Sequence, residues 1–112
     1  SGLANSQARN GQFDIALEAY MKSLEINTHN ASAHLGIGDI LYKMKNYNLA
    51  EQHLARAIEL DPEIVEGYIF LAAVKVKQND YKNASLFLSR GLILNPDHAI
   101  GKIMKRELTN IE

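Results

Sequence analysis

The chain has 112 residues, 46% of them hydrophobic and 22% charged, and its formal net charge is −1. This composition is typical of a globular chain long enough for one domain, and it excludes an intrinsically disordered one. The absence of a concentrated basic patch argues against nucleic acid as a partner, because phosphate binding depends on clustered Lys and Arg. The absence of cysteine excludes disulfides and thiolate chemistry. No apolar run approaches the ~20 residues that membrane insertion requires, and the compartment stays open, with the cytoplasm favoured over the periplasm.

The residues repeat with a period of 34 along the chain. Five columns share one register: Phe13, Tyr47 and Tyr81; Ala16, Ala50 and Ala84; Ile26, Leu60 and Leu94; Asn27, Asp61 and Asn95; and Thr28, Pro62 and Pro96. A fixed period of this length predicts a stacked solenoid, in which each unit buries its apolar face only against its neighbours. The period divides the single domain into units 1–30, 31–64 and 65–98, followed by a segment 99–112.

Each unit is predicted to hold two helices. In the first unit the first helix is cut short, and the second helix begins at Phe13. In the second unit one helix begins at Ala31 and another at Tyr47. The second helices are predicted to stop before Asp61-Pro62 and Asn95-Pro96, because proline disfavours helix at the residue before it.

Short polar side chains are expected to cap the second helix of each unit. Asn46 and Asp80 stand where a side chain can accept hydrogen bonds from the first free N–H groups of that helix. Gln12 occupies the same column in the first unit and is a poorer cap. The alanine column, together with Gly38 and Ala72 on the first helices, predicts that the two helices of a unit approach closely. A large side chain there should clash.

A final helix is predicted from Ala99 to about Ile111, with its apolar and basic residues on separate faces. The apolar stripe holds Ile100, Ile103, Met104, Leu108 and Ile111, and the polar face holds Lys102, Lys105, Arg106 and Thr109. At this place in the chain, such a helix indicates a cap that ends the solenoid. A membrane-surface or calmodulin-type helix is the alternative interpretation.

The column pattern resembles the tetratricopeptide repeat (TPR) family, which has the same period. In the second unit the family's columns hold His34, Ile37-Gly38, Leu41, Ala50, Leu54, Ala57 and Pro62. The resemblance extends from Leu3 to His98. It implies an all-α fold, an α-solenoid of three helix-turn-helix repeats in a right-handed superhelix, followed by the capping helix. Lys75 stands in a column that is usually aromatic, so its ammonium is expected in water near an edge.

The sequence contains no catalytic or metal-binding pattern. The histidines are His29, His34, His53 and His98, and no two of them have the i, i+4 spacing of a zinc protease helix. No glycine elbow surrounds a serine, and no glycine-rich phosphate loop follows a strand. We therefore expect no enzyme activity, no cofactor and no metal site.

The TPR resemblance places the functional surface on the inner, concave face, which the first helix of each unit forms in that family. The residues carried to this groove are Asn5, Leu35, Asp39, Tyr42, Lys43, Glu66, Ile69, Phe70, Ala73, Val76 and Lys77. A mostly apolar groove of this kind suits an apolar segment of a partner, bound as a helix or as an extended peptide. The alternative is that Ile69 and Phe70 belong to the plain core.

Some TPR proteins hold the carboxylate end of a chaperone tail with two Lys, two Asn and an Arg. Of those positions only Asn5 carries the matching residue, and the others hold Ser1, Gly36, Glu66 and Phe70. This carboxylate clamp is therefore absent, and heat-shock chaperone tails are not the expected ligand.

Two functions stay open. The first is a protein-interaction scaffold or adaptor that binds a peptide or partner protein in the concave groove. The alternative is a structural segment of a larger TPR protein, attached to an enzyme or assembly machine, that self-associates through its solenoid ends. The cut-short first helix motivates this alternative, because Leu3, Ala8 and the surface from Ala16 to Tyr20 would lack a neighbour, and exposed apolar ends are association sites.

Overall fold

The computed structural model describes the backbone of residues 2–111 and the side chains of residues 12–110. All regular structure in this part of the chain is helical. The helices are α1 (Gly2–Ile26), α2 (Ala31–Lys43), α3 (Tyr47–Leu60), α4 (Val65–Lys77), α5 (Tyr81–Leu94) and α6 (Ala99–Ile111). Within residues 2–111, no helix combines the length and apolar character needed to cross a membrane.

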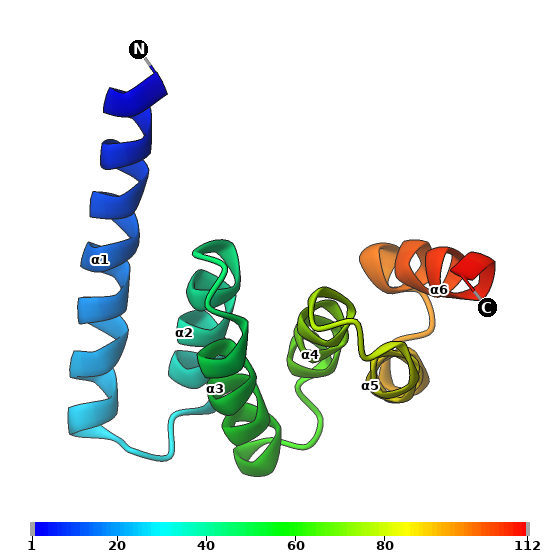
Figure 1. Cartoon of the computed structure of the whole chain (residues 1–112). Coiled ribbons are helices and arrows are strands. Elements are labelled where there is room, and N and C mark those ends of the chain that lie inside the picture. Colours follow the sequence, from blue (N-terminus) through cyan, green and yellow to red (C-terminus); the bar gives the residue numbers. More distant parts are fainter. Residues whose placement is uncertain (1, 112) are drawn as a thin grey trace.

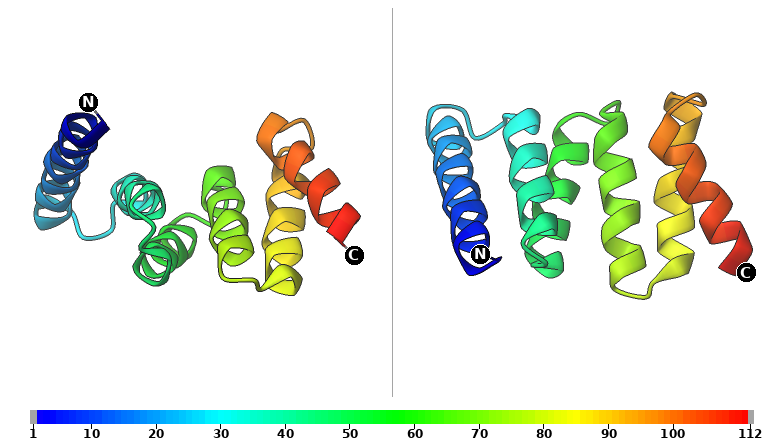
Figure 2. Two further views of the ribbon diagram at one scale, coloured as in Figure 1. Left: turned by 45° about the horizontal axis from the view of Figure 1, so that its top comes forward. Right: turned by 90° about the horizontal axis from the view of Figure 1, so that it is seen from above.

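The helices form a row in which each one packs on its neighbours in sequence (Figure 1). α2 pairs with α3 and α4 pairs with α5 as helix-turn-helix units, and α4 also touches α2. α1 and α6 stand at opposite ends of the row (Figure 2). The all-α repeat architecture predicted from the 34-residue period is thus confirmed.

The helix boundaries follow the local chemistry of the repeat. α3 ends at Leu60 and α5 at Leu94, one residue before each predicted Asp-Pro or Asn-Pro stop. Asp80 caps α5 as predicted, because its carboxylate accepts a hydrogen bond from the backbone N–H of Asn83 at 3.3 Å. Asn46 occupies the same position before α3 but makes no side-chain cap bond, so the prediction of its capping role is wrong.

The tight turns inside the second and third units need a left-handed residue. Lys45 has φ 67° and Asn79 has φ 63°, and both lie just after the first helix of their unit. This conformation redirects the chain into the second helix.

The first unit departs from the predicted pair of helices, because α1 runs without a break from Gly2 to Ile26. Gly11 stands in the column of the turn residues Lys45 and Asn79, yet its backbone is helical. Gln12, in the column of Asn46 and Asp80, is helical as well, so the chain makes no turn at this point.

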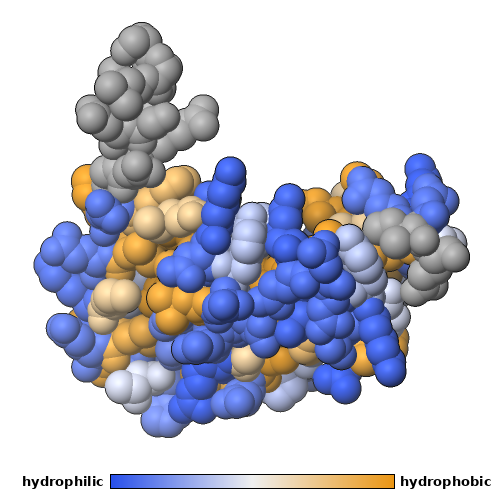
Figure 3. Space-filling view, viewed as in Figure 1, coloured by the Kyte–Doolittle hydropathy of each residue, from blue (hydrophilic) through white to orange (hydrophobic). Residues whose placement is uncertain are grey.

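The straight course of α1 leaves one of its faces without a covering helix among the described residues. Ala16 and Tyr20 are only half-buried, whereas Ala50 and Leu54 in the same columns are 0% exposed. Apolar surface is accordingly visible at the α1–α2 end of the molecule (Figure 3).

The core forms two neighbouring clusters, one centred on α2, α3 and α4 and the other on α4, α5 and α6. The small-residue columns bring helices together as predicted. A Cβ added to Gly38 would lie 2.5 Å from Leu54 Cγ and 3.4 Å from the backbone oxygen of Ala50. The two helices of the second unit therefore have no room for a larger side chain in these columns.

Lys75 does not lie at a solvated edge, so the prediction for its ammonium is wrong. Its side chain is only 14% exposed, and Nζ lies 3.1 Å from Glu51 Oε2 and 3.9 Å from Asp80 Oδ2. Gln78 joins the same group by donating to Glu51 Oε1 at 3.0 Å. Because Glu51 belongs to α3 and Lys75 to α4, this polar group ties the second unit to the third.

The apolar stripe predicted for the capping helix is only partly covered. Leu108 is buried and Met104 half-buried, but Ile100 is 55% and Ile103 56% exposed. Ile103 stands in the column of Ile69, which lies under Gly101 of α6. No other helix among the described residues covers Ile103, so this part of the predicted apolar stripe is open to solvent.

Candidate functional site

The main apolar groove lies where α2, α4 and α6 converge, and we call it the α2–α4–α6 groove. It has a volume of about 400 Å³ and is lined by Asp39, Tyr42, Lys43, Ile69, Phe70, Ala73, Val76, Lys77, Ile100, Met104, Glu107 and Leu108. Each of the three helices contributes one face, so the repeat spacing itself sets the width of the groove.

The floor of the groove is apolar and is anchored in the hydrophobic core. Ile69 is 1% exposed and belongs to the second core cluster, so it supports the floor from beneath. Phe70 and Val76 are half-buried, with part of each side chain open to a ligand. Met104 adds a flexible thioether from α6, a side chain that adapts to irregular apolar partners.

Charged side chains stand at the rim of the groove. Lys43 Nζ lies 3.3 Å from Asp39 Oδ2, one turn away on α2, in a solvent-exposed pair that contributes little to stability. Lys77 and Glu107 are exposed, and neither forms an ion pair within the part of the chain whose side chains are described. Besides the Asp39–Lys43 pair, the rim thus offers one cation, Lys77, and one anion, Glu107, to charged groups that flank an apolar ligand.

The structure brings together most of the residues carried to the groove by resemblance. Those lining it are Asp39, Tyr42, Lys43, Ile69, Phe70, Ala73, Val76 and Lys77. Leu35 instead packs against the first core cluster, and Glu66 is exposed outside the lining. Asn5 belongs to the helical backbone of α1, but its side chain lies outside the described residues.

Sequence reasoning missed the contribution of α6. Ile100, Met104 and Glu107 stand one period after Glu66, Phe70 and Ala73. The register that carried the earlier residues to the groove could therefore have carried these three as well. The register was not applied to α6, because this helix was interpreted as a cap.

Three positions that the resemblance assigns to the carboxylate clamp hold Gly36, Glu66 and Phe70. A Cβ on Gly36 would collide with the ring of Tyr20 on α1, so a larger side chain has no room there. Glu66 carries a negative charge that repels a carboxylate, and Phe70 replaces a cation with an apolar ring.

A second feature lies away from the groove, where His34 on α2 meets His53 on α3. Their Nδ1 atoms are 3.2 Å apart and their rings stack at 5.4 Å. Burial lowers the pKa of both imidazoles; the positive charge of Arg56 adds to this for His34, while the backbone carbonyl of Thr28 opposes it. Among the described residues no group of three His, Cys, Asp or Glu side chains could hold a metal ion.

Comparison with known proteins agrees with the repeat architecture. Two tetratricopeptide repeat models match, one over residues 2–30 and the other over residues 31–64, so together they cover more than half of the chain. The chain belongs to the tetratricopeptide repeat family. No curated protein sequence matches this TPR chain.

Solved TPR structures share this fold at low sequence identity. The Arabidopsis OM64 TPR domain has 20% identity and a TM-score of 0.87, covering 96% of this chain and 89% of its own. The first TPR of Spaghetti (RPAP3), bound to the HSP90 peptide SRMEEVD, has 19% identity and a TM-score of 0.86, with 96% and 85% covered. YrrB, a TPR protein with an unusual peptide-binding site, has 19% identity and a TM-score of 0.78; the match covers 88% of this chain and about half (51%) of YrrB.

Proposed function

We propose that this TPR domain is a protein-interaction scaffold whose α2–α4–α6 groove binds an apolar segment of a partner protein. The observation that carries the proposal is the apolar floor beneath a groove of about 400 Å³, open along Phe70, Val76 and Met104. Most binding energy in such sites comes from apolar anchors that enter a preformed pocket. Solved TPR domains of the same fold bind peptides, which supports a peptide segment of a partner as the ligand.

The chemistry of the groove also defines what it selects. An apolar side chain of the partner rests on the floor, and charged flanking residues of the partner meet Lys77 and Glu107. Recognition of this kind does not depend on a free C-terminal carboxylate, since the clamp positions hold Gly36, Glu66 and Phe70. The HSP90 peptide SRMEEVD is therefore not expected to bind.

A library of random linear peptides displayed on phage tests the proposal. Peptides selected by the native domain should carry an apolar residue between charged ones, and they should bind equally well when resynthesised with free or amidated C-termini. Fluorescence anisotropy measures each affinity, with SRMEEVD as the comparison peptide. Selection of acidic peptides that require the free carboxylate would contradict the proposal.

Groove variants and a matched control make the test specific. Ala73→Glu places a charged side chain on the floor, and Ile100→Asp adds a charge from α6 at a side chain that is already exposed. Each should lower the affinity at least tenfold while the circular dichroism spectrum stays native. Leu86→Glu, on the exposed surface of α5 and outside the lining, should leave the affinity unchanged. Retained binding by both folded groove variants would overturn the proposal.

A further inference from the structure

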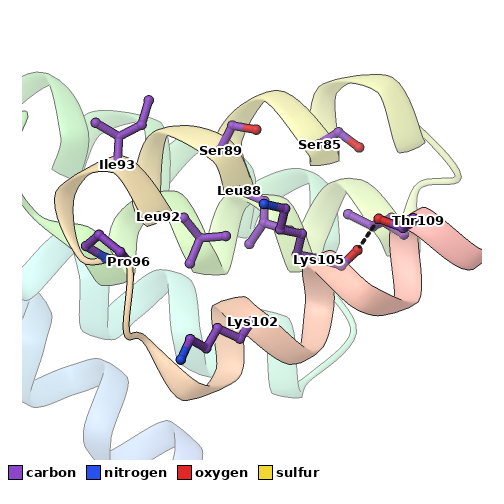
Figure 4. A pocket seen from close by; sticks show the side chains of 10 residues that line it. Ser85, Leu88, Ser89, Leu92, Ile93, Pro96, Lys102, Lys105 and Thr109 are labelled. Atoms are coloured by element: carbon purple, nitrogen blue, oxygen red, sulfur yellow. Dashed lines mark hydrogen bonds between the residues drawn. The ribbon is translucent and has the colours of Figure 1, made fainter.

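A second hollow lies on the far side of α6, in the crease between α5 and α6. It has a volume of about 610 Å³ and is lined by Ser85, Leu88, Ser89, Leu92, Ile93, Pro96, Lys102, Lys105, Leu108 and Thr109. Leu88 and Leu92 form its floor on α5; Lys105 extends from α6 toward Leu88, whereas Lys102 extends away from the two leucines (Figure 4). We call this surface the α5–α6 crease.

The repeat register shows what shape of ligand such a crease accepts. The equivalent crease one period earlier lies between α3 and α4, where Tyr68 and Leu71 stand in the columns of Lys102 and Lys105. There the next helix, α5, covers the crease by packing Phe87 into the cluster of Leu54 and Leu71. A crease of this geometry therefore has the width to accept a helix.

The charge of the α5–α6 crease selects the kind of helix. Lys105 forms no ion pair within the described residues, and Lys102 has only a loose, exposed contact with Asp97 at 3.7 Å. Among the residues that line the crease, Lys102 and Lys105 are basic and none is acidic. An acidic helix with an apolar contact would complement the basic rim and the leucine floor.

The opposite end of the same molecule presents such a helix. On α1, Asp14, Glu18, Met21 and Glu25 follow one another at spacings of four, three and four residues, so they share one stripe. All four are exposed, and none of the three carboxylates forms an ion pair within the described side chains. Lys22 is the only basic residue of segment 12–26.

We propose that the acidic stripe of α1 docks into the α5–α6 crease of a second copy of this chain. Met21, which is 50% exposed, would rest on the leucine floor, with Glu18 beside Lys105. The exposed Ile93 at the lip of the crease adds apolar area to this contact. This surface lies on the other side of α6 from the α2–α4–α6 groove and shares only the buried Leu108 with it, so a peptide and a second copy can bind at the same time.

The positions of the two surfaces determine the type of assembly. α1 and α6 stand at opposite ends of the row of helices, so one molecule cannot satisfy its own crease (Figure 2). The contact is heterologous, since two different patches meet, and such contacts generate open chains or rings rather than two-fold dimers. The expected product is a head-to-tail oligomer that grows with concentration.

Sedimentation velocity over a concentration series tests this association. The weight-average mass of the native chain should rise with concentration and fall toward the monomer in high salt, because salt screens exposed charge pairs. Glu18→Lys and Lys105→Glu should each remain monomeric, because each substitution places two like charges at the contact. An equimolar mixture of the two variants should associate again, since opposite charges meet wherever the α1 stripe of one variant docks into the crease of the other.

Controls separate this surface from charge effects in general. Lys82→Glu and Glu63→Lys make the same charge changes at exposed positions outside both surfaces, and they should associate like the native chain. A native chain that stays monomeric up to millimolar concentration would overturn the proposal. Charge-reversal variants that fail to recover on mixing, although each is folded by circular dichroism, would also overturn it. Neither result bears on peptide binding in the α2–α4–α6 groove.

Discussion

Replacing Ala50 by leucine should destabilise the domain far more than the same change at Ala16, although both belong to one column of the repeat. Ala50 is fully buried, and its backbone oxygen would lie 3.4 Å from a Cβ on Gly38 of the facing helix. The three additional carbon atoms of leucine have no space there. Overpacking of this kind costs ~1–3 kcal/mol. At Ala16 the added atoms can point into solvent, and such surface changes stay within about 0.5 kcal/mol.

Urea denaturation followed by circular dichroism measures the difference. With a slope of about 2 kcal/mol per molar urea, a loss of ~2 kcal/mol lowers the midpoint by about 1 M. Ala16→Leu should leave the midpoint within about 0.3 M of the native value on the same slope. In the double variant Ala50→Leu/Leu54→Ala, the smaller side chain at position 54 frees space beside the added leucine, so part of the lost stability should be recovered. Equal midpoints for Ala50→Leu and Ala16→Leu would refute the packing argument.

Three further outcomes follow from the contacts. The thermal midpoint should fall as the pH drops below about 6.5, the ordinary pKa of the two imidazoles. Folding lowers the pKa of His34 and His53, so the unfolded chain binds more protons than the folded one in acid. Calorimetry should show that the midpoint of the double variant His34→Gln/His53→Gln depends less on acid, and an unchanged acid dependence would contradict this explanation. Glu51→Ala should cost ~1 kcal/mol in urea denaturation, because the mostly buried ammonium of Lys75 loses its nearest carboxylate, and adding Lys75→Leu should recover it. Amide hydrogen exchange should be slowest in α2 and α3, which form the middle unit and pack on neighbouring helices at both sides, and fastest in α1; equal protection would count against nearest-neighbour stabilisation.

The repeat columns predicted most of the fold, because the residue type in each column has a direct effect on local structure or packing. Pro62 and Pro96 disfavour helix at the residue before them, and buried alanines at one period indicate close helix contact. The continuous α1 could not be predicted from the columns, since Gly11 fits a left-handed turn as well as it fits the interior of a helix. The balance between these two conformations depends on what packs against the segment, and that is a tertiary property.

The part of the candidate site on α2 and α4 could be predicted from the repeat register. The part on α6 was missed, because α6 was interpreted as a cap and the register was not applied to it. Asp39, Phe70 and Ala73 were placed by column, and the groove contains them. The prediction for Lys75 rested on its column, which is usually aromatic in the family, so that its ammonium was expected to reach water. Glu51 lies one helix away, at a position that only the packed structure reveals. The α5–α6 crease likewise depends on two helices that meet at an angle the sequence does not state.

The measurement that tests the central claim most directly is an NMR titration of the isotopically labelled domain with a peptide selected from the library. Binding in the α2–α4–α6 groove should shift the amide signals of Phe70, Ala73 and Met104, and the methyl signals of Val76, in proportion to occupancy. Signals from Ser89 in the α5–α6 crease should stay in place at dilute protein concentration. Saturable shifts confined to the crease or to α1, with the groove signals unmoved, would contradict the account.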